Sequence, residues 1–289
     1  MYPELQKMTT PISVRRLTYV LAPLLIALFG SMALAQEGPL DKSEPKGITV
    51  DEIIQKFAAK EKQFKEAREQ YTWRQDVRVK DDSGGEYRMV TDILFDDRGK
   101  RIENVVFAPQ ATLRDVSMTR EDIDDIEKRL PFVLTSDEIP EYNILYVGQQ
   151  QQDEIHTYVF DIAPKKIEKN RRYFQGRIWV DDTDFQIVKT NGKNVPDITK
   201  GQENLFPDFT TWREQIDGKY WFPTFTKVDD TLHFKNGDVH IVQTVKYNNY
   251  KRFGSKVKIT YEGQDIGVAD QQQPQQPQEP PATNPPPKK

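Results

Sequence analysis

The pattern of apolar and polar residues predicts one long helix followed by a series of strands. Between residues 53 and 67, apolar side chains recur every three or four positions with charged side chains between them, which is typical of an amphipathic helix. Thr49 and Glu52 have capping-box spacing, so the helix is expected to begin at Thr49 and run to about Gln70. Such a helix must pack its apolar stripe against another part of the protein.

After this helix the pattern changes to an alternation with period two. In YTWRQDVRVK, the side chains of Tyr71, Trp73, Val77 and Val79 share one face and polar side chains share the other. Similar segments follow, separated by turn residues. Strands are predicted at 71–80, 87–95, 101–107, 142–147, 154–162, 172–180, 185–195, 209–217, 220–228, 231–235, 238–250 and 256–262.

The turn signals between these segments include residues 148–152, Asp217-Gly218 and Asn236-Gly237. Hairpins at this frequency predict one antiparallel sheet wound around itself, rather than strands that alternate with helices.

A second, shorter helix is predicted at 119–130, where Thr119 and Asp122 can cap TREDIDDIEKRL and Ile123 and Ile126 form an apolar edge. The fold class is therefore mainly β with helices (α+β). A curved sheet that does not close has a concave apolar face, which helices can either fill as ordinary core or cover with space left for a lipid chain. Periodicity alone leaves both alternatives open.

The N-terminus is typical of a targeting segment. Two arginines precede an apolar run at 17–34, and Ala-Leu-Ala at 33–35 fits a cleavage site. We expect residues 1–35 to be a signal peptide rather than a membrane anchor, and the mature protein to be soluble and periplasmic if the host has two membranes. Translation starts at Met1 or Met8.

The rest of the chain divides into three predicted parts. Residues 36–48 form a polar linker, residues 49–262 form one domain, and residues 263–289 form a Gln/Pro-rich tail that is expected to be disordered. The tail is interpreted as an inert tether or, alternatively, as an arm that recognises envelope components.

Composition and charge exclude several classes of function. The formal net charge is only −4 with both signs interspersed, so the sequence predicts no nucleic-acid partner. The chain contains no cysteine, so it has neither disulfides nor the acylated cysteine of a bacterial lipoprotein. Stability must therefore come from packing and backbone hydrogen bonds.

The aspartates in RIWVDDTDFQIVKTNG raise the question of an acid/base or metal site. Asp181, Asp182 and Asp184 fall between two predicted strands, where aspartate favours turns, and the spacing of a calcium loop is absent. They are interpreted as turn residues. In a two-residue turn at Asn236-Gly237, two histidines, His233 and His240, would face each other, and an exposed pair is favoured over a zinc site.

The sequence carries none of the familiar catalytic motifs. It has no Gly-x-Ser-x-Gly, no phosphate-binding glycine loop and no His-Glu-x-x-His, and its carboxylates form no pair that spacing can justify for catalysis. We therefore predict a protein that is not an enzyme and that uses no cofactor and no metal.

Several segments resemble LolA-like proteins, which are known in bacteria as outer-membrane lipoprotein-sorting proteins. The segments YTWRQDVRV, GGEYRMVTDILFDDRGKR and RYFQGRIWVDDTDFQIVKTNGKNVPD carry this resemblance. FTTWREQIDGKYWFPTFTKVDDTLHF and VHIVQTVKYNNYKRF resemble variants common in exported acidobacterial proteins. The resemblance covers most of residues 49–262 and rests on strand-and-turn patterns rather than on a catalytic signature.

The resemblance implies a half-open antiparallel β-barrel with an N-terminal amphipathic helix and a short lid helix. It further implies a monomeric periplasmic carrier that binds lipid or lipoprotein acyl chains and exchanges them with inner- or outer-membrane transport proteins. The alternatives are an RseB-like regulatory protein that senses lipids or lipoproteins, and a structural envelope protein with a filled barrel. Extra segments at 109–140 and 196–207, together with the tail, depart from the simple carrier, so carriage of another lipid fits equally well.

By the same resemblance, the lipid-binding residues would be aromatic and aliphatic side chains on the inner face of the first two strands. These are Trp73, Val77, Tyr87, Met89 and Ile93. In the carriers an arginine on the first barrel strand helps to hold the lid, and Arg74 is the nearest candidate in this sequence.

Overall fold

The computed structural model describes residues 37–96, 100–128, 133–169, 171–196, 206–252, 259–261 and 264–266. The chain separates into two compact units, Met1–Ala35 and Gln36–Lys289, and all described residues belong to the second unit. The predicted signal peptide and most of the predicted tail therefore lie outside the described residues, and these two assignments stay predictions.

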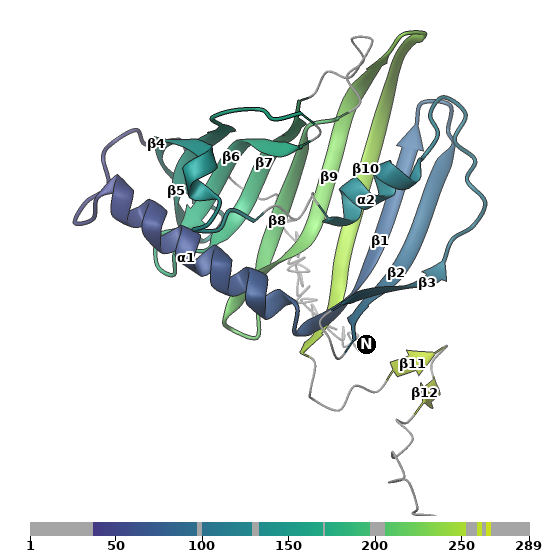
Figure 1. Ribbon diagram of the computed structural model, residues 1–289, viewed down its shortest axis with the longest axis horizontal. Helices are drawn as coiled ribbons and strands as arrows, with labels where there is room; N and C mark the ends of the chain where they lie inside the picture. The colour runs from purple at the N-terminus through teal and green to yellow at the C-terminus, as the bar shows by residue number, and fades with distance from the viewer. Residues whose placement is uncertain are drawn as a thin grey trace, which may run out of the picture. The chain divides into compact units, whose positions relative to one another are not determined.

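Ten strands form a single antiparallel sheet that curves without closing (Figure 1). The strand order is β3-β2-β1-β10-β9-β8-β7-β6-β5-β4, so β3 and β4 are the two edges. The strands are β1 (Tyr71–Asp81), β2 (Glu86–Phe95), β3 (Arg101–Phe107), β4 (Tyr142–Gln152), β5 (Ile155–Pro164), β6 (Tyr173–Asp181), β7 (Ile187–Val195), β8 (Phe209–Ile216), β9 (Tyr220–Phe234) and β10 (Gly237–Arg252). The predicted fold class, a half-open antiparallel barrel with helices, is confirmed.

A separate two-stranded pair, β11 (Ile259–Tyr261) and β12 (Gln264–Ile266), follows the main sheet in the chain. A three-residue 3₁₀ helix, η1 (Ile139–Glu141), precedes β4. Among the described residues, no helix combines the length and the apolar character needed to cross a membrane.

Helix α1 (Val50–Arg68) begins as the sequence predicts. The Thr49 hydroxyl accepts a hydrogen bond from the Glu52 N–H at 3.2 Å, and the Glu52 carboxylate accepts one from the Thr49 N–H at 2.8 Å. This reciprocal pair is a capping box, and it satisfies two donors that the helix leaves unpaired. Helix α2 (Arg120–Lys128) confirms the second predicted helix, with Thr119 and Asp122 bonded at its start.

Both helices lie on the same face of the curved sheet (Figure 1). Helix α1 crosses the strands from β5 to β8, whereas α2 lies over β9, β10 and β1. One continuous core joins them to the sheet. Its fully buried members include Ile53 and Phe57 of α1, Val77 and Ile93 of the first two strands, and Phe160 of β5.

Two predicted boundaries are wrong because local turn signals were overridden by strand pairing. The predicted break between 228 and 231 is absent, and Tyr220–Phe234 forms one strand in which Asp229 is paired with Lys227 and His240. The predicted turn at 148–152 is also absent, because β4 continues through Gln152 to a turn at 153–154.

The turn between β9 and β10 lies one residue earlier than predicted, which shifts every cross-strand partner by two residues. Gly237 pairs with Phe234, so Lys235 and Asn236 form the turn. His233 therefore lies opposite Asp238, and His240 lies opposite Thr231. The predicted cross-strand pair of histidines is wrong, because moving the turn by one residue changes every partner in a hairpin.

Part of the predicted linker belongs to the sheet. Residues 37–41 pair with the edge strand β4, with Glu37 opposite Gln152 and Asp41 opposite Gln149. The backbone of this segment approaches Gly148 so closely that a Cβ at that position would lie 2.2 Å from the Asp41 carbonyl oxygen. Only glycine fits there, so the close contact between the linker and the edge of β4 depends on Gly148.

A buried ion pair fixes the middle of α1 to the sheet. The Glu61 carboxylate accepts hydrogen bonds from Arg213 Nη1 of β8 at 2.9 and 3.1 Å, and both side chains are fully buried. Burial raises the pKa of Glu61, and the charge and hydrogen bond of Arg213 oppose this effect. The guanidinium also lies over the Phe64 ring, with 5.1 Å to its centroid. Each charge therefore depends on its partner, because either one alone would be buried without compensation.

Replacing Arg213 by methionine should lower the free energy of unfolding by about 3–5 kcal/mol, because the variant leaves the Glu61 carboxylate buried and unpaired. The double variant Glu61→Leu/Arg213→Met should recover most of this loss. Lys62→Met is the matched control, because it breaks an exposed pair with Asp137 on the same helix and should have a far smaller effect. Urea denaturation measures all three, and equal losses for Arg213→Met and Lys62→Met would contradict the assignment.

On the sheet surface, His240 connects three elements. Its Nδ1 lies 3.0 Å from a carboxylate oxygen of Asp82, and its Nε2 lies 3.0 Å from one of Asp229. Hydrogen bonds to Asp82 and Asp229 raise the pKa of His240 above its ordinary value of 6.5. The contribution to stability is therefore fully present below the unfolded-state pKa and is lost as the pH rises through the folded-state value.

Asp229→Asn should lower the pKa of His240, because the substitution removes one of the two carboxylates that favour the imidazolium. NMR titration of the imidazole measures this shift, and Asp238→Asn, beside His233 instead, serves as the control. The destabilisation caused by Asp229→Asn should fade as the pH rises through the folded-state pKa. A pKa of His240 that is equal in both variants would refute the proposed pairing.

Candidate ligand-binding site

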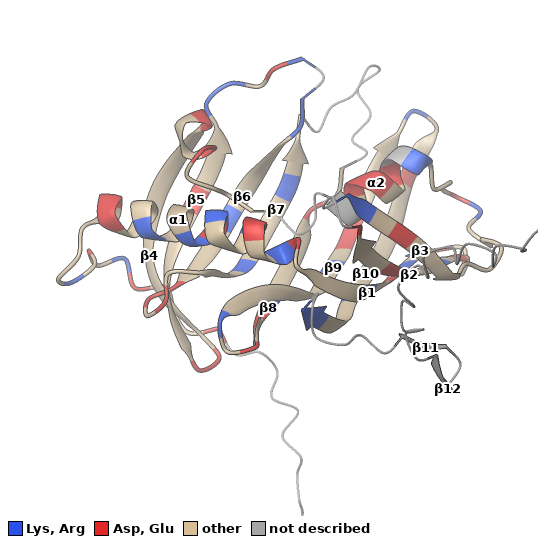
Figure 2. Cartoon of the chain, turned by 60° about the horizontal axis from the view of Figure 1, so that its bottom comes forward, with Lys and Arg blue, Asp and Glu red and all other residues tan. Residues whose placement is uncertain are grey.

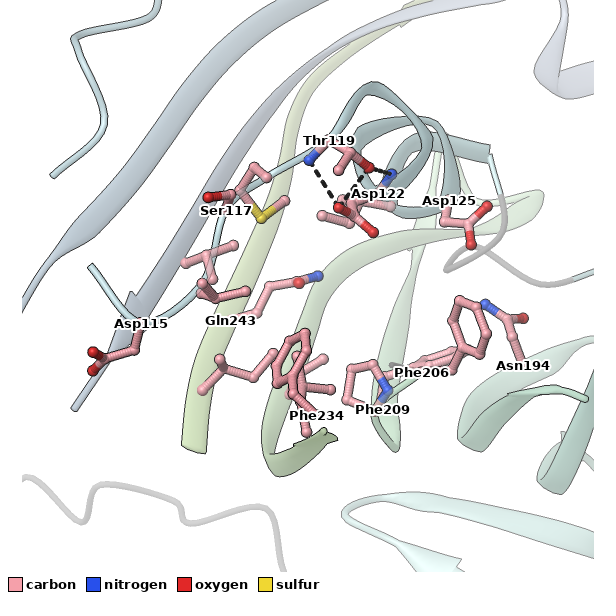
Figure 3. Close-up of a pocket in the computed structure, with 18 of the residues that line it drawn as sticks. Asp115, Ser117, Thr119, Asp122, Asp125, Asn194, Phe206, Phe209, Phe234 and Gln243 are labelled. Carbon is pink, nitrogen blue, oxygen red and sulfur yellow. Dashed lines mark hydrogen bonds between the residues drawn. The ribbon is translucent and has the colours of Figure 1, made fainter. Parts of the chain in front are cut away.

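A cavity of about 460 Å³ lies between α2, the loop that leads into it, and the inner face of the sheet (Figure 3). Its volume falls within the range of about 300–1,000 Å³ that is usual for small-molecule sites. The sheet supplies an apolar floor from four adjacent strands. The floor residues are Val79 of β1, Ile241 of β10, Val228, Leu232 and Phe234 of β9, and Phe209 of β8.

The roof of the cavity combines three apolar side chains, Val116 and Met118 of the loop and Ile126 of α2, with polar residues of the same loop and helix, which are Ser117, Thr119, Asp122 and Asp125. This loop is held by Asp81 at the end of β1, whose carboxylate accepts hydrogen bonds from the N–H groups of Arg114 and Asp115 at 2.9 and 3.1 Å. Burial raises the pKa of Asp81, but hydrogen bonds from Ser83 and from backbone N–H groups outweigh burial and lower it to about 2. The roof is therefore attached to the floor at its loop end.

Helix α2 itself is held by two ion pairs. Arg120 approaches Glu103 of β3 at 3.5 Å, and Asp125 approaches Arg172, just before β6, at 3.6 Å. The Arg172 guanidinium also lies over the Phe206 ring, with 3.5 Å to its centroid. These pairs span the opening of the sheet and are partly exposed, so each contributes little to stability and is weakened by salt.

Two polar side chains interrupt the apolar wall. Gln243 of β10 and Asn194 of β7 line the cavity and are 5% and 8% exposed, respectively (Figure 3). Neither side-chain amide has a hydrogen-bond partner among the described residues. Asp122 and Asp125 line the cavity from α2, whereas Asp115 lies at the start of the loop, away from the helix.

The predicted lipid-binding residues lie on the helix-covered face but outside the lining of this cavity. Trp73, Val77 and Ile93 are buried in the core, Met89 is paired with Val77, and Tyr87 packs at the edge of the core. Their nearest link to the cavity is Val79, which lines the cavity and pairs with Tyr87. Their lipid-binding role stays a prediction.

Arg74 lies on the opposite face of β1 from Trp73. Its guanidinium donates hydrogen bonds to the Asp92 carboxylate of β2 at 2.7 and 2.9 Å. Among the described contacts, the charge pair that joins a helix to the inner strands is Glu61–Arg213 instead. The lid contact predicted for Arg74 stays a prediction.

The aspartates of the 181–184 turn act as the sequence analysis predicts. Asp181 accepts hydrogen bonds from the N–H groups of Thr183 and Asp184 at 2.6 and 3.1 Å, and Asp184 accepts one from the Trp221 indole at 2.9 Å. They form a turn far along the sheet from the cavity lining. Within the described ranges, no group of three or more histidine, aspartate or glutamate side chains is arranged to hold a metal ion.

Sequence reasoning missed most of the cavity, because its floor comes from strands at the far end of the chain. The signal was present in the alternation of Val228, Leu232 and Phe234 and of Ile241 and Gln243, but alternation does not reveal which strands a helix covers. The pairing of β1 with β10 determines which strands lie together under the helix, and it joins residues that are 179 positions apart in the sequence.

A second hollow of about 640 Å³ lies on the outer face, beside Gly176 and Gly192. It is larger but more open to solvent, and Arg177, which is paired with Asp161, stands at its border. The cavity under α2 is the more enclosed of the two, so we take it as the candidate site.

The site and fold together define a class of protein, an open antiparallel half-barrel whose helices cover an apolar cavity. No protein-family model and no curated protein matches the chain. Several solved structures are similar to the chain. A DUF1329 family protein from Desulfovibrio piger is 14% identical with a TM-score of 0.36, covering 68% of this chain and 92% of that one.

Two further structures are similar. A LolA superfamily protein from Nitrosomonas europaea is 13% identical with a TM-score of 0.32, covering 67% of this chain and 93% of that one. The MucA/MucB complex of Pseudomonas aeruginosa contains a chain that is 10% identical with a TM-score of 0.21, covering 68% of this chain and 99% of that one. At these identities and TM-scores, the likeness by itself assigns no ligand and no partner to this chain.

Proposed function

We propose that this protein is a periplasmic carrier that binds lipid or lipoprotein acyl chains, without catalysis, in the cavity under α2. The observation that supports this function is the 460 Å³ cavity with an apolar floor in a fold whose other helix is packed as core. Removal of residues 1–35 as a signal peptide would deliver the domain to that compartment.

The energetics of acyl binding fit a cavity of this kind. Each methylene group moved from water into an apolar interior contributes about 0.8 kcal/mol. Eight buried methylenes therefore contribute roughly 6 kcal/mol before the cost of association is subtracted. This gain is large enough for capture and small enough for release to a partner with a better site, which is what a carrier requires.

Helix α2 is the element that would open. Its two ion pairs are partly exposed, and Ile126 is its only buried side chain among those described. Helix α1, by contrast, is fixed by the buried pair of Glu61 and Arg213. We therefore assign the lid to α2, which can move without uncovering the main core.

The predicted residues on β1 and β2 extend this site. Tyr87 lies beside the cavity residue Val79, and the pairs Val77–Met89 and Trp73–Ile93 continue from it along the same face. We propose that a chain longer than the cavity would lie against this row of side chains, and that Arg74 on the other face keeps β1 and β2 aligned through Asp92.

Leu232→Trp should abolish lipid binding, because the larger side chain fills the cavity from its floor. Leu145→Trp is the matched control, because it adds the same volume at a side chain that is 66% exposed on β4. Native mass spectrometry of each protein, purified gently from its own periplasm, should show a bound lipid mass in the wild type and in Leu145→Trp but not in Leu232→Trp.

Wild-type protein that carries no lipid mass and binds no added acyl chain would contradict the carrier function. This outcome would favour the alternative of a structural envelope protein, in which the barrel serves only as a packed scaffold.

The second candidate function is an RseB-like sensor that binds a protein partner. The specific observation in its favour is the edge strand β3, where Ile102, Val105, Val106 and Phe107 are 37–53% exposed. An exposed apolar edge can accept an added strand from another chain.

Val105→Lys should prevent capture of such a partner, because lysine on an edge strand opposes strand addition. Crosslinking in the periplasm followed by affinity purification measures capture, and Lys80→Ala, an exposed change on β1, is the control. Loss of a partner in Val105→Lys together with retained lipid would favour the sensor, whereas an unchanged set of crosslinks would exclude β3 as its docking edge.

A further inference from the structure

The cavity under α2 contains two buried amides that the protein itself leaves without a partner. Gln243 and Asn194 are more than nine-tenths buried, both line the cavity, and neither side chain has a hydrogen-bond partner among the described residues. The amide atoms of both residues are accessible from the cavity, so water or a ligand in the cavity can complete their hydrogen bonds. Both amides stand on the sheet side of the cavity beside its apolar floor, and they point to a ligand that carries a polar group of its own.

The two amides stand on separate walls of the cavity. Gln243 belongs to β10 and Asn194 to β7, with β9 and β8 between them, so about 14 Å of sheet separates the two strands. In Figure 3, Gln243 projects toward the centre, whereas Asn194 lies beside the ring of Phe206. A polar group at either wall leaves the apolar floor between the amides free for the hydrocarbon chain.

The charges around the cavity restrict the nature of that polar group. Asp115, Asp122 and Asp125 supply three carboxylates, and Arg172, already paired with Asp125, supplies one guanidinium. Figure 2 shows that α2 is predominantly acidic. A carboxylate or phosphate brought under this helix would be repelled and would also lose its hydration, whereas an uncharged group avoids both costs.

From these observations we propose that the cavity selects acyl chains whose polar end is an uncharged amide over chains that end in a carboxylate, with Gln243 at one wall or Asn194 at the other as the hydrogen-bond partner of that amide. This inference rests on the proposed acyl-binding function and deepens it. An amide donates and accepts, as the two side chains do, so it can complete hydrogen bonds of either direction. An ester only accepts, and it should bind with intermediate affinity.

Isothermal titration calorimetry at pH 8 with decanamide, methyl decanoate and decanoate tests this order, because the three ligands share one chain length. Wild-type protein should bind decanamide at least about tenfold more tightly than decanoate, the size expected for one additional buried hydrogen bond. The double variant Gln243→Leu/Asn194→Leu, which roughly keeps the side-chain volumes, should lose the preference for decanamide while retaining chain binding, and the two single variants identify the wall that holds the amide.

Gln75→Leu is the matched control. Gln75 is also a buried amide without a hydrogen-bond partner on the inner face of the sheet, but it lies outside the cavity lining, so its replacement should leave the preference unchanged. Thermal melts of each variant verify folding, and the wild-type series alone decides the order if a variant fails to fold.

The possible outcomes separate the two proposals. Equal binding of decanamide and decanoate, or tighter binding of decanoate, would overturn the amide selectivity and leave the carrier function intact. A preference for decanamide that survives in the double variant Gln243→Leu/Asn194→Leu would overturn the assignment of these residues. Failure of all three ligands to bind wild-type protein would overturn the carrier function and, with it, this inference.

Discussion

The need to cover one apolar face of an open sheet is the constraint on which the rest of this structure depends. A closed barrel would bury that face by itself, but β3 and β4 remain apart and the concave side must be covered by other elements. Helix α1 covers the strands from β5 to β8 with large side chains such as Phe57, and no lining residue of the cavity comes from it. Helix α2 is short and presents only a narrow apolar edge, so the space beneath it is not filled.

The two helices also differ in how their charges are used. Glu61 of α1 and Arg213 are excluded from water, and either charge would be strongly unfavourable without its partner. The pair therefore fixes the position of α1 on the sheet. The ion pairs of α2 with Glu103 and Arg172 are partly in contact with solvent and are easily exchanged for water. The same kind of interaction therefore makes one helix a permanent part of the core and leaves the other able to move.

The sequence predicted the elements of the fold more reliably than the site. The capping box at Thr49 and the alternation in β1 are local signals, and the structure confirms both. Local signals were misleading where strand pairing decided the outcome. In the hairpin before Gly237 the turn lies one residue earlier than predicted, so His233 and His240 do not face each other. The inner face of β1 was identified correctly, but which part of that face stays unfilled depends on where α2 packs. That position is fixed by distant partners such as Asp81 and Arg172, which no periodic pattern reveals.

The pairing of β1 with β10 has a consequence for the order of folding. Strands that are distant in sequence pair late, because a long loop must close before the pairing gains any free energy. The floor of the cavity straddles this seam, with Val79 on one side and Ile241 on the other. A chain in which β1 and β10 are not yet paired has no cavity, so a ligand cannot assist the early collapse of the chain. Any ligand of the cavity would therefore bind only the completed fold, and by stabilising the pairing of β1 with β10 it would slow unfolding rather than accelerate folding.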